Sequence, residues 1–300
     1  MQQHGRIGEE IRQNIQLSCF QYVLDHDVSF QVNPALFKLK ALAADDVNIQ
    51  AILFGSPTTQ HINMLSDKLI KALIAFSWHR CNNMKPNLEI ANHAVSMAKA
   101  FGNKRYTASS LWCLGKMYGF LGEYSVVYHH LQEAYKLYNA LLPGTRNLQR
   151  LCCQCGISMV DGAYSSLTFK DGGNVVSLAR DVEKQAASVS DELEYIYARS
   201  LVMLGKVLNR YGHRQEALND LERAKLMDTG ASALSSDIHY SIALVHHHDN
   251  RLPEALDAAK EAWKLSDPYT NDLVRQVQNS FLLGMILLNV NRDTEAWKYL

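Results

Sequence analysis

The stretch that most constrains the fold is Thr107–Leu142, which reads TASSLWCLGKMYGFLGEYSVVYHHLQEAYKLYNALL. Leu111, Leu114 and Gly115 recur at the three- and four-residue spacing of one helix face. Gly122 follows where that helix must end, because a residue without a Cβ atom adopts the left-handed conformation of a helix terminus at little cost. The apolar face of a second helix then follows at Val127, Leu131 and Ala134. The stretch therefore predicts two helices joined by a tight turn.

The motif L-x-x-L-G-x-x-Y, which runs from Leu111 to Tyr118 before the turn glycine, resembles the tetratricopeptide repeat. Its glycine position recurs at Gly115, Gly156, Gly205, Ala243 and Gly284. These positions are 41, 49, 38 and 41 residues apart, whereas the standard repeat has about 34 residues. The longer period is similar to the variant repeats of kinesin light chains and signal-transducing NTPases. The resemblance implies an all-α fold, a right-handed α-solenoid of antiparallel helix pairs.

The repeat pattern covers residues 61–300, and residues 1–60 form an N-terminal helical segment that does not fit it. In that segment the sequence predicts a helix over Gly5–Leu24, a second that begins at Asn33-Pro34, and a third capped by Asp45-Asp46. The chain stops at Leu300, about two turns into the second helix of the last pair. We therefore expect an array truncated at its C-terminus, with additional domains in the full-length chain.

Charge and cysteine content narrow the class of protein. The chain has 30 basic and 30 acidic residues, so the charge balance argues against a nucleic-acid binder. Six cysteines lie inside apolar helical patterns, which is typical of reduced thiols in the cytoplasm or the nucleus. The longest apolar stretch, Phe281–Leu288, is too short to cross a bilayer, so we expect no membrane insertion.

Three clusters in the sequence resemble metal or catalytic sites. Cys152 and Cys155 are three residues apart, but a structural zinc needs four ligands and no second cysteine pair exists. The run from His246 to His248 points in different directions around a helix. Asp45-Asp46 lacks the third carboxylate of the Asp-Asp-x-x-Asp motif of terpene cyclases. With no phosphate-binding glycine loop either, the sequence predicts no metal, no cofactor and no enzymatic activity.

The predicted function is a non-catalytic scaffold that binds a peptide or helix of a partner protein in a concave groove. Two alternatives remain open. The chain is the C-terminal sensor array of a larger NTPase-type signalling switch, or it is an all-helical enzyme, against which stands the lack of a convergent carboxylate pair.

In the resembled family, the first helices of successive repeats line the groove at fixed offsets from the glycine position. Those offsets select the following residues: Trp112, Lys116, Phe120, Arg150, Arg199, Lys206, Asn209, Arg210, Tyr240, His247 and Phe281, with Cys153, Val202, Leu244, Gln278 and Met285 beside them. The middle of this set is basic and its flanks are aromatic. We therefore expect a ligand with acidic residues around an apolar anchor; the alternative is that these are ordinary solvated helix faces.

Overall fold

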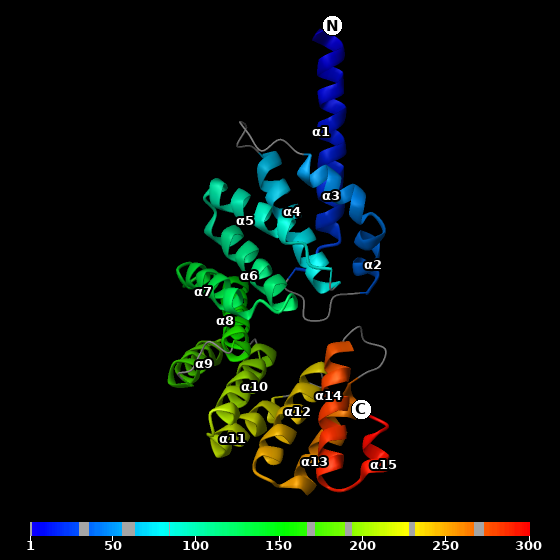
Figure 1. Ribbon diagram of the computed structural model, residues 1–300. Helices are drawn as coiled ribbons and strands as arrows, with labels where there is room; N and C mark the ends of the chain where they lie inside the picture. Colours follow the sequence, from blue (N-terminus) through cyan, green and yellow to red (C-terminus); the bar gives the residue numbers. More distant parts are fainter. Residues whose placement is uncertain are drawn as a thin grey trace. The chain divides into compact units, whose positions relative to one another are not determined.

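The computed structural model describes residues 2–29, 36–55, 64–83, 85–166, 172–189, 194–227, 232–266 and 273–300. Within these segments the regular secondary structure is entirely helical (Figure 1). The chain divides into two compact units, Met1–Thr168 (unit 1) and Phe169–Leu300 (unit 2). From α4 onward in unit 1, and throughout unit 2, each helix packs against the next. The expected all-α fold of the α-solenoid class is therefore confirmed.

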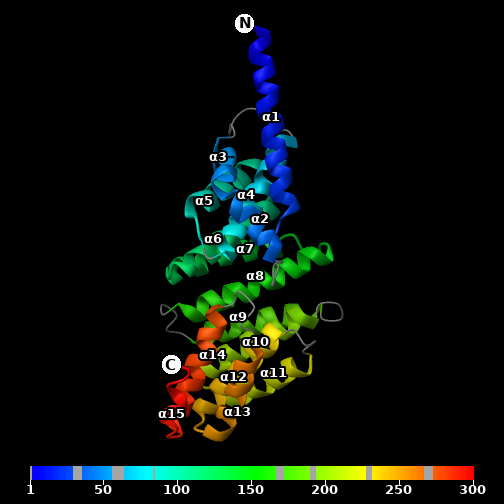
Figure 2. The same ribbon diagram turned by 90° about the vertical axis from the view of Figure 1, so that its right-hand side faces the viewer.

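Unit 1 contains eight helices in its described segments. They are α1 (Gln2–Asp25), α2 (Leu36–Ala44), α3 (Asp46–Phe54), α4 (Met64–Asn82), α5 (Leu88–Phe101), α6 (Lys104–Phe120), α7 (Tyr124–Asn139) and α8 (Arg146–Ser165). From α4 onward each helix packs on the next, while α1 packs on α3 and α4. The N-terminal half of α1 extends beyond the other helices of the unit (Figures 1 and 2).

Unit 2 contains seven helices in its described segments. They are α9 (Gly172–Ala187), α10 (Glu194–Arg210), α11 (Arg214–Leu226), α12 (Ser232–His248), α13 (Leu252–Leu265), α14 (Leu273–Asn289) and α15 (Asp293–Ala296). The first helices of three successive repeats, α10, α12 and α14, also contact each other directly and lie side by side in both views (Figures 1 and 2). This arrangement places their outward side chains on one continuous surface.

Four first helices end in the same hydrogen-bonded turn. The residue seven positions after the glycine position has a positive φ: 79° at Gly122, 87° at Gly212, and 58° at both Asn250 and Asn291. The next backbone N–H donates to a carbonyl five residues earlier, for example from His213 to Leu208 at 2.9 Å. This is the helix-ending pattern that glycine and asparagine favour. The turn predicted at Gly122 is confirmed.

The glycine position is a point of close helix contact. A Cβ atom built on Gly205 would lie 2.8 Å from Cγ of Leu221 on the paired helix. Gly115 and Gly284 meet leucines at the same sixteen-residue separation, with closest distances of 3.0 and 2.6 Å. A hydrogen atom at these places lets the two helix backbones approach, and the leucine fills the space between them. The glycine position of the repeat is therefore a packing position.

The N-terminal segment requires one correction. Asp45 precedes α3, but its side chain makes no capping hydrogen bond; instead it accepts one from the Tyr22 hydroxyl at 3.4 Å. Asp46 pairs with Arg80 of α4. Both carboxylates therefore join α3 to other helices rather than cap its N-terminus. The predicted start of α2 at Asn33-Pro34 lies outside the described residues. The boundary expected at residues 60 and 61 stays a prediction.

Candidate functional site

Two of the offsets from the glycine position that select the predicted groove residues differ in exposure. Residues one position after it are exposed or half-buried: Lys116, Lys206, Leu244 and Met285. Residues three positions before it are mostly buried: Trp112, Cys153 and Val202 are at most 5% exposed, Tyr240 is half-buried, and Phe281 is exposed. Since a helix turns about 100° per residue, these two offsets lie on adjacent strips of the helix. Of the predicted residues at these two offsets, only those one position after the glycine position are all exposed or half-buried.

Trp112 is a core residue and not a groove residue. Its side chain is 4% exposed, and it packs edge-on against Trp78 of α4 and Tyr138 of α7, with ring centroids 5.2 and 6.2 Å apart. Its indole N–H donates to the Ser158 hydroxyl at 3.1 Å. Trp112 therefore joins α6 to three other helices, and no partner molecule has access to its face.

In unit 1 the remaining predicted residues, Lys116, Phe120 and Arg150, differ in exposure and in their contacts. Lys116 is exposed and Phe120 is 46% exposed at the end of α6. Arg150 is half-buried, and its guanidinium donates to Asn147 at 3.0 Å on the same helix. Burial lowers the pKa of Arg150. Of the predicted residues in unit 1, Lys116 is thus the exposed cation, and it lies four residues before the exposed ring of Phe120.

Unit 2 brings together a cationic cluster formed by Arg199, Lys206, Asp237 and Arg275. Asp237 on α12 accepts hydrogen bonds from Nε and a terminal nitrogen of Arg275 on α14, at 3.0 and 3.3 Å. Arg199 and Lys206 approach the same carboxylate from α10. Arg199 also lies over the ring of Tyr195, 6.0 Å from its centroid. All three first helices of unit 2 therefore contribute to the cluster.

The electrostatics of the cluster centre on Asp237. Burial raises the pKa of Asp237, but the charges of Lys206, Arg275 and Arg199 and the hydrogen bond from Arg275 outweigh it, so the net pKa lies below the usual aspartate value. Asp237 is therefore ionised at neutral pH. Three basic side chains, Arg199, Lys206 and Arg275, thus act on one carboxylate in this part of the described structure.

Near the C-terminal ends of α10, α12 and α14, polar side chains join each helix to the next. Asn209 of α10 is 7% exposed, and its amide oxygen lies 3.2 Å from Nδ1 of His248 on α12. His247 on α12 lies 2.7 Å from the amide nitrogen of Asn289 on α14. The expected groove residues Asn209 and His247 thus join successive repeats. Arg210, one residue further, is exposed.

Two residues of the cationic cluster were not among the predicted site residues. Asp237 lies six residues before Ala243, the same offset that selects Arg199 before Gly205. Applying that offset to every repeat finds it. Arg275 lies nine residues before Gly284, an offset at which no groove residue was expected. No local sequence signal marks Arg275, because its partner is 38 residues away in the chain.

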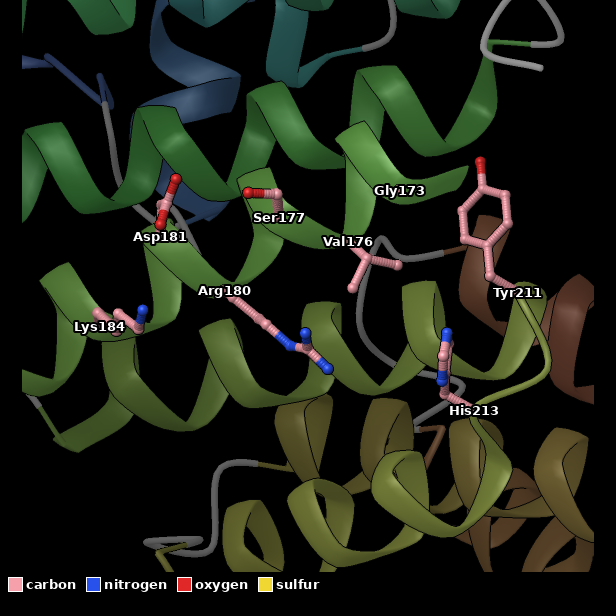
Figure 3. A pocket seen from close by; sticks show the side chains of 8 residues that line it. All are labelled: Gly173, Val176, Ser177, Arg180, Asp181, Lys184, Tyr211 and His213. Carbon is pink, nitrogen blue, oxygen red and sulfur yellow. The ribbon is translucent and has the colours of Figure 1, made fainter. Parts of the chain in front are cut away.

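A pocket of about 590 Å³ lies on another surface of unit 2, between α9 and the turn after α10. Figure 3 shows Arg180 between Lys184 and His213, with Tyr211 near the turn. Its charges are balanced: Arg180 pairs with Glu216 at 2.7 Å, and Asp181 lines the pocket together with Lys184. Arg180 and Lys184 are thus accompanied by two acidic side chains, Asp181 and Glu216.

The cysteine cluster of α8, one of the three candidate metal sites, is buried. Cys152, Cys153 and Cys155 are fully buried free thiols. Burial raises the pKa of the Cys153 thiol to about 12, which opposes the thiolate form that metals bind. Among the residues that the structure describes, no group of three or more His, Cys, Asp or Glu is placed to hold a metal ion. None of the helices in the described segments is long and apolar enough to cross a membrane.

Solved structures share this fold. NprR, solved in complex with its cognate peptide NprX, aligns with a TM-score of 0.64 and 14% identity over 99% of this chain and 82% of NprR. The Rap conjugation regulator of plasmid pLS20, in complex with the Phr* peptide, aligns at 0.57 and 15% over 96% and 72%. Aspartyl phosphate phosphatase F from Bacillus subtilis aligns at 0.57 and 15% over 97% and 76%. The sequence matches no protein-family model and no curated protein. The chain thus has a tetratricopeptide-like helical-repeat fold.

Proposed function

We propose that this chain is a non-catalytic scaffold that binds a peptide segment of a partner on the surface formed by α10, α12 and α14. One observation carries the proposal. The positive charges of Arg199, Lys206 and Arg275 all act on the carboxylate of Asp237, so three basic side chains from α10 and α14 gather around one point of this surface. A peptide that carries one or two carboxylates complements this group of basic side chains.

The chemistry of the surface defines the ligand. A guanidinium holds a carboxylate through two parallel hydrogen bonds, and Arg199 presents one beside the ring of Tyr195. Leu244 and Met285 occupy the same offset as Lys206 on α12 and α14 and are half-buried, so they offer an apolar contact next to the charges. We therefore expect an acidic residue beside an apolar anchor in the ligand.

The solved structures support peptide binding as a property of this architecture. NprR and the plasmid regulator were each solved with a peptide, and a further Rap protein was solved with the Competence and Sporulation Factor. One neighbour is named a phosphatase; the proposal for this chain is limited to peptide binding. We also propose a cytoplasmic location, because the cysteines of the described residues are free thiols.

The second candidate is the sensor array of a larger NTPase-type switch. The repeat spacing of 41, 49, 38 and 41 residues favours it, because it resembles the long-period repeats of those proteins. It differs from the first candidate in needing an NTPase module on the same polypeptide. A search of the gene upstream of Met1 for a phosphate-binding loop tests it.

The test of the first candidate is a selection of short random peptides by display on the purified chain, followed by titration calorimetry of the best peptide. The double variant Arg199→Glu/Lys206→Glu is compared with Arg180→Glu/Lys184→Glu, which makes the same charge change at the α9 pocket. We expect the first pair to weaken binding by more than about tenfold, or about 1.4 kcal/mol, and the wild-type affinity to fall with salt.

The control pair makes the outcome specific to the surface. Binding that is lost in Arg180→Glu/Lys184→Glu and kept in Arg199→Glu/Lys206→Glu assigns the peptide to the α9 pocket and refutes the proposal. Equal affinity in both variants and in the wild type places the peptide on neither surface and also refutes it. Circular dichroism of each variant checks that the helices remain intact.

A further inference from the structure

Asp237 on α12 occupies the position that a bound carboxylate would take in the cationic cluster. Arg275 on α14 donates from Nε to one carboxylate oxygen at 3.0 Å and from a terminal nitrogen to the other at 3.3 Å. This is the two-point geometry in which a guanidinium holds a carboxylate. The charges of Arg199 and Lys206 on α10 act on the same group. A ligand carboxylate that approaches these basic side chains therefore meets one of the chain's own carboxylates already in place.

The packing of the repeat does not require an acidic residue at this position. Asp237 lies six residues before the glycine position of its repeat. The same offset holds a serine, two arginines and a glutamine in the other repeats: Ser109, Arg150, Arg199 and Gln278. The neighbouring residues Ser236 and Ile238 are 0% and 1% exposed, and they provide the buried contacts of this part of α12. The carboxylate of Asp237 thus belongs to the surface chemistry of α12 and not to its core packing.

Both partners of the ion pair reach solvent. The side chain of Asp237 is 31% exposed and that of Arg275 is 22% exposed, so the pair opens without leaving a fully buried charge behind. Tyr240 and Leu244, both half-buried, follow Asp237 by three and seven residues on the same face of α12. A peptide at the cluster has these two side chains within reach, whereas a small inorganic anion has no group that gains from them.

We propose that Asp237 is an internal competitor for acidic ligands of this surface, an inference that rests on the proposed peptide site. In the free chain its carboxylate holds Arg275, and an incoming anion has to displace that carboxylate or bind beside its charge. Either route lowers the affinity of every anionic ligand. A peptide offsets the loss with apolar contacts at Tyr240 and Leu244, and a small anion does not. Asp237 therefore restricts the surface to ligands that combine an acidic group with an apolar one.

Equilibrium dialysis with radiolabelled sulfate at constant ionic strength tests the proposal without a peptide. We expect Asp237→Asn to bind sulfate at least about tenfold more tightly than the wild type, because the competing charge is lost and the side-chain shape is kept. Asp237→Glu keeps the charge and should bind sulfate as weakly as the wild type. Asp257→Asn removes one negative charge at an exposed position of α13, and it should also leave the sulfate affinity unchanged.

A second substitution locates the gain in affinity. Asp237→Asn/Arg199→Gln should lose most of it, because one of the basic side chains that hold the sulfate is then absent. Equal sulfate affinity in Asp237→Asn and in the wild type overturns the proposal. So does a gain that survives Arg199→Gln undiminished or that also appears in Asp257→Asn. Circular dichroism checks each fold; if Asp237→Asn does not fold, Asp237→Ser takes its place, since Ser109 is the equivalent residue in unit 1.

Titration calorimetry with the display-selected peptide separates this inference from the proposed function. Asp237→Asn should bind the peptide more tightly than the wild type, by a factor similar to that for sulfate. A peptide that binds both chains equally, or binds the variant more weakly, refutes the competitor role of Asp237 and leaves peptide binding intact. A gain in sulfate affinity without any selected peptide supports the competitor role and contradicts the proposed function.

Discussion

Adding one methyl group at Gly205 should destabilise the fold, although alanine favours helices over glycine. Gly205 lies in the middle of α10, where alanine gains about 0.8–1 kcal/mol from helix propensity. The new Cβ atom would lie 2.8 Å from Cγ and 3.0 Å from Cδ2 of Leu221, and 3.3 Å from the carbonyl oxygen of Ala217. Contacts this short require the two helices to move apart.

The expected change in the free energy of unfolding is the packing cost minus the gain in helix propensity. Leu221 is 0% exposed, and the nearest atom is a branch point rather than a mobile end, so its side chain has little room to turn away. Overpacking of this kind costs about 1–3 kcal/mol. After subtracting the helix gain of about 0.8–1 kcal/mol, we expect Gly205→Ala to reduce the free energy of unfolding by up to about 2 kcal/mol. Thermal denaturation followed by circular dichroism measures the loss.

Gly119 provides the matched control. It is also a helical glycine, in the last turn of α6, but a Cβ atom there meets only Cγ2 of Val127, at an ordinary 3.8 Å. Gly119→Ala should therefore leave the melting temperature unchanged or raise it. If both variants melt at or above the wild-type temperature, the close helix contact at the glycine position does not exist as described, and the register of the repeats is wrong.

Three further predictions follow from buried or strained residues. Burial lowers the pKa of His79 to about 4. Because the unfolded state binds the proton more tightly, the free energy of unfolding should fall by at most about 3 kcal/mol as the pH drops from about 6.5 to about 4. In urea denaturation measured at a series of pH values, His79→Gln should make the free energy of unfolding less dependent on pH over this range. Asn250 has a φ of 58°, so Asn250→Ala should lower the free energy of unfolding by about 1–2 kcal/mol and Asn250→Gly should not, as compared by melting curves. Trp112→Ala should lower the free energy of unfolding by about 3–5 kcal/mol, because it leaves a cavity in the core. A change in melting temperature of less than a few degrees would mean that Trp112 is not a core residue.

The turns and the helix pairs were predictable because their signals are local. A glycine or asparagine ends each of the four helices at a fixed distance from the glycine position, and the backbone conformation that it adopts is a property of that residue alone. The sixteen-residue separation of Gly205 and Leu221 also lies within one helix pair. Sequence reasoning therefore recovers the repeat and its internal packing.

The candidate site was only partly predictable because it depends on contacts between repeats. Trp112 has the same offset as Phe281, yet one is buried and the other exposed, and the difference lies in what packs against each helix. Asp237 and Arg275 are joined across 38 residues, which a pattern within one repeat does not show. Asp45 resembles a helix cap in sequence, but Tyr22 provides its side-chain contact.

The central claim is that the surface of α10, α12 and α14 binds a peptide. The most direct measurement is photo-crosslinking of a display-selected peptide to chains that carry benzoylphenylalanine in place of Tyr240, Tyr211 or Leu226. Tyr240 is half-buried on α12, Tyr211 lines the α9 pocket, and Leu226 is exposed on α11. The account predicts a crosslink from position 240 that excess unlabelled peptide suppresses. A crosslink from position 211 or 226, with none from position 240, would contradict it.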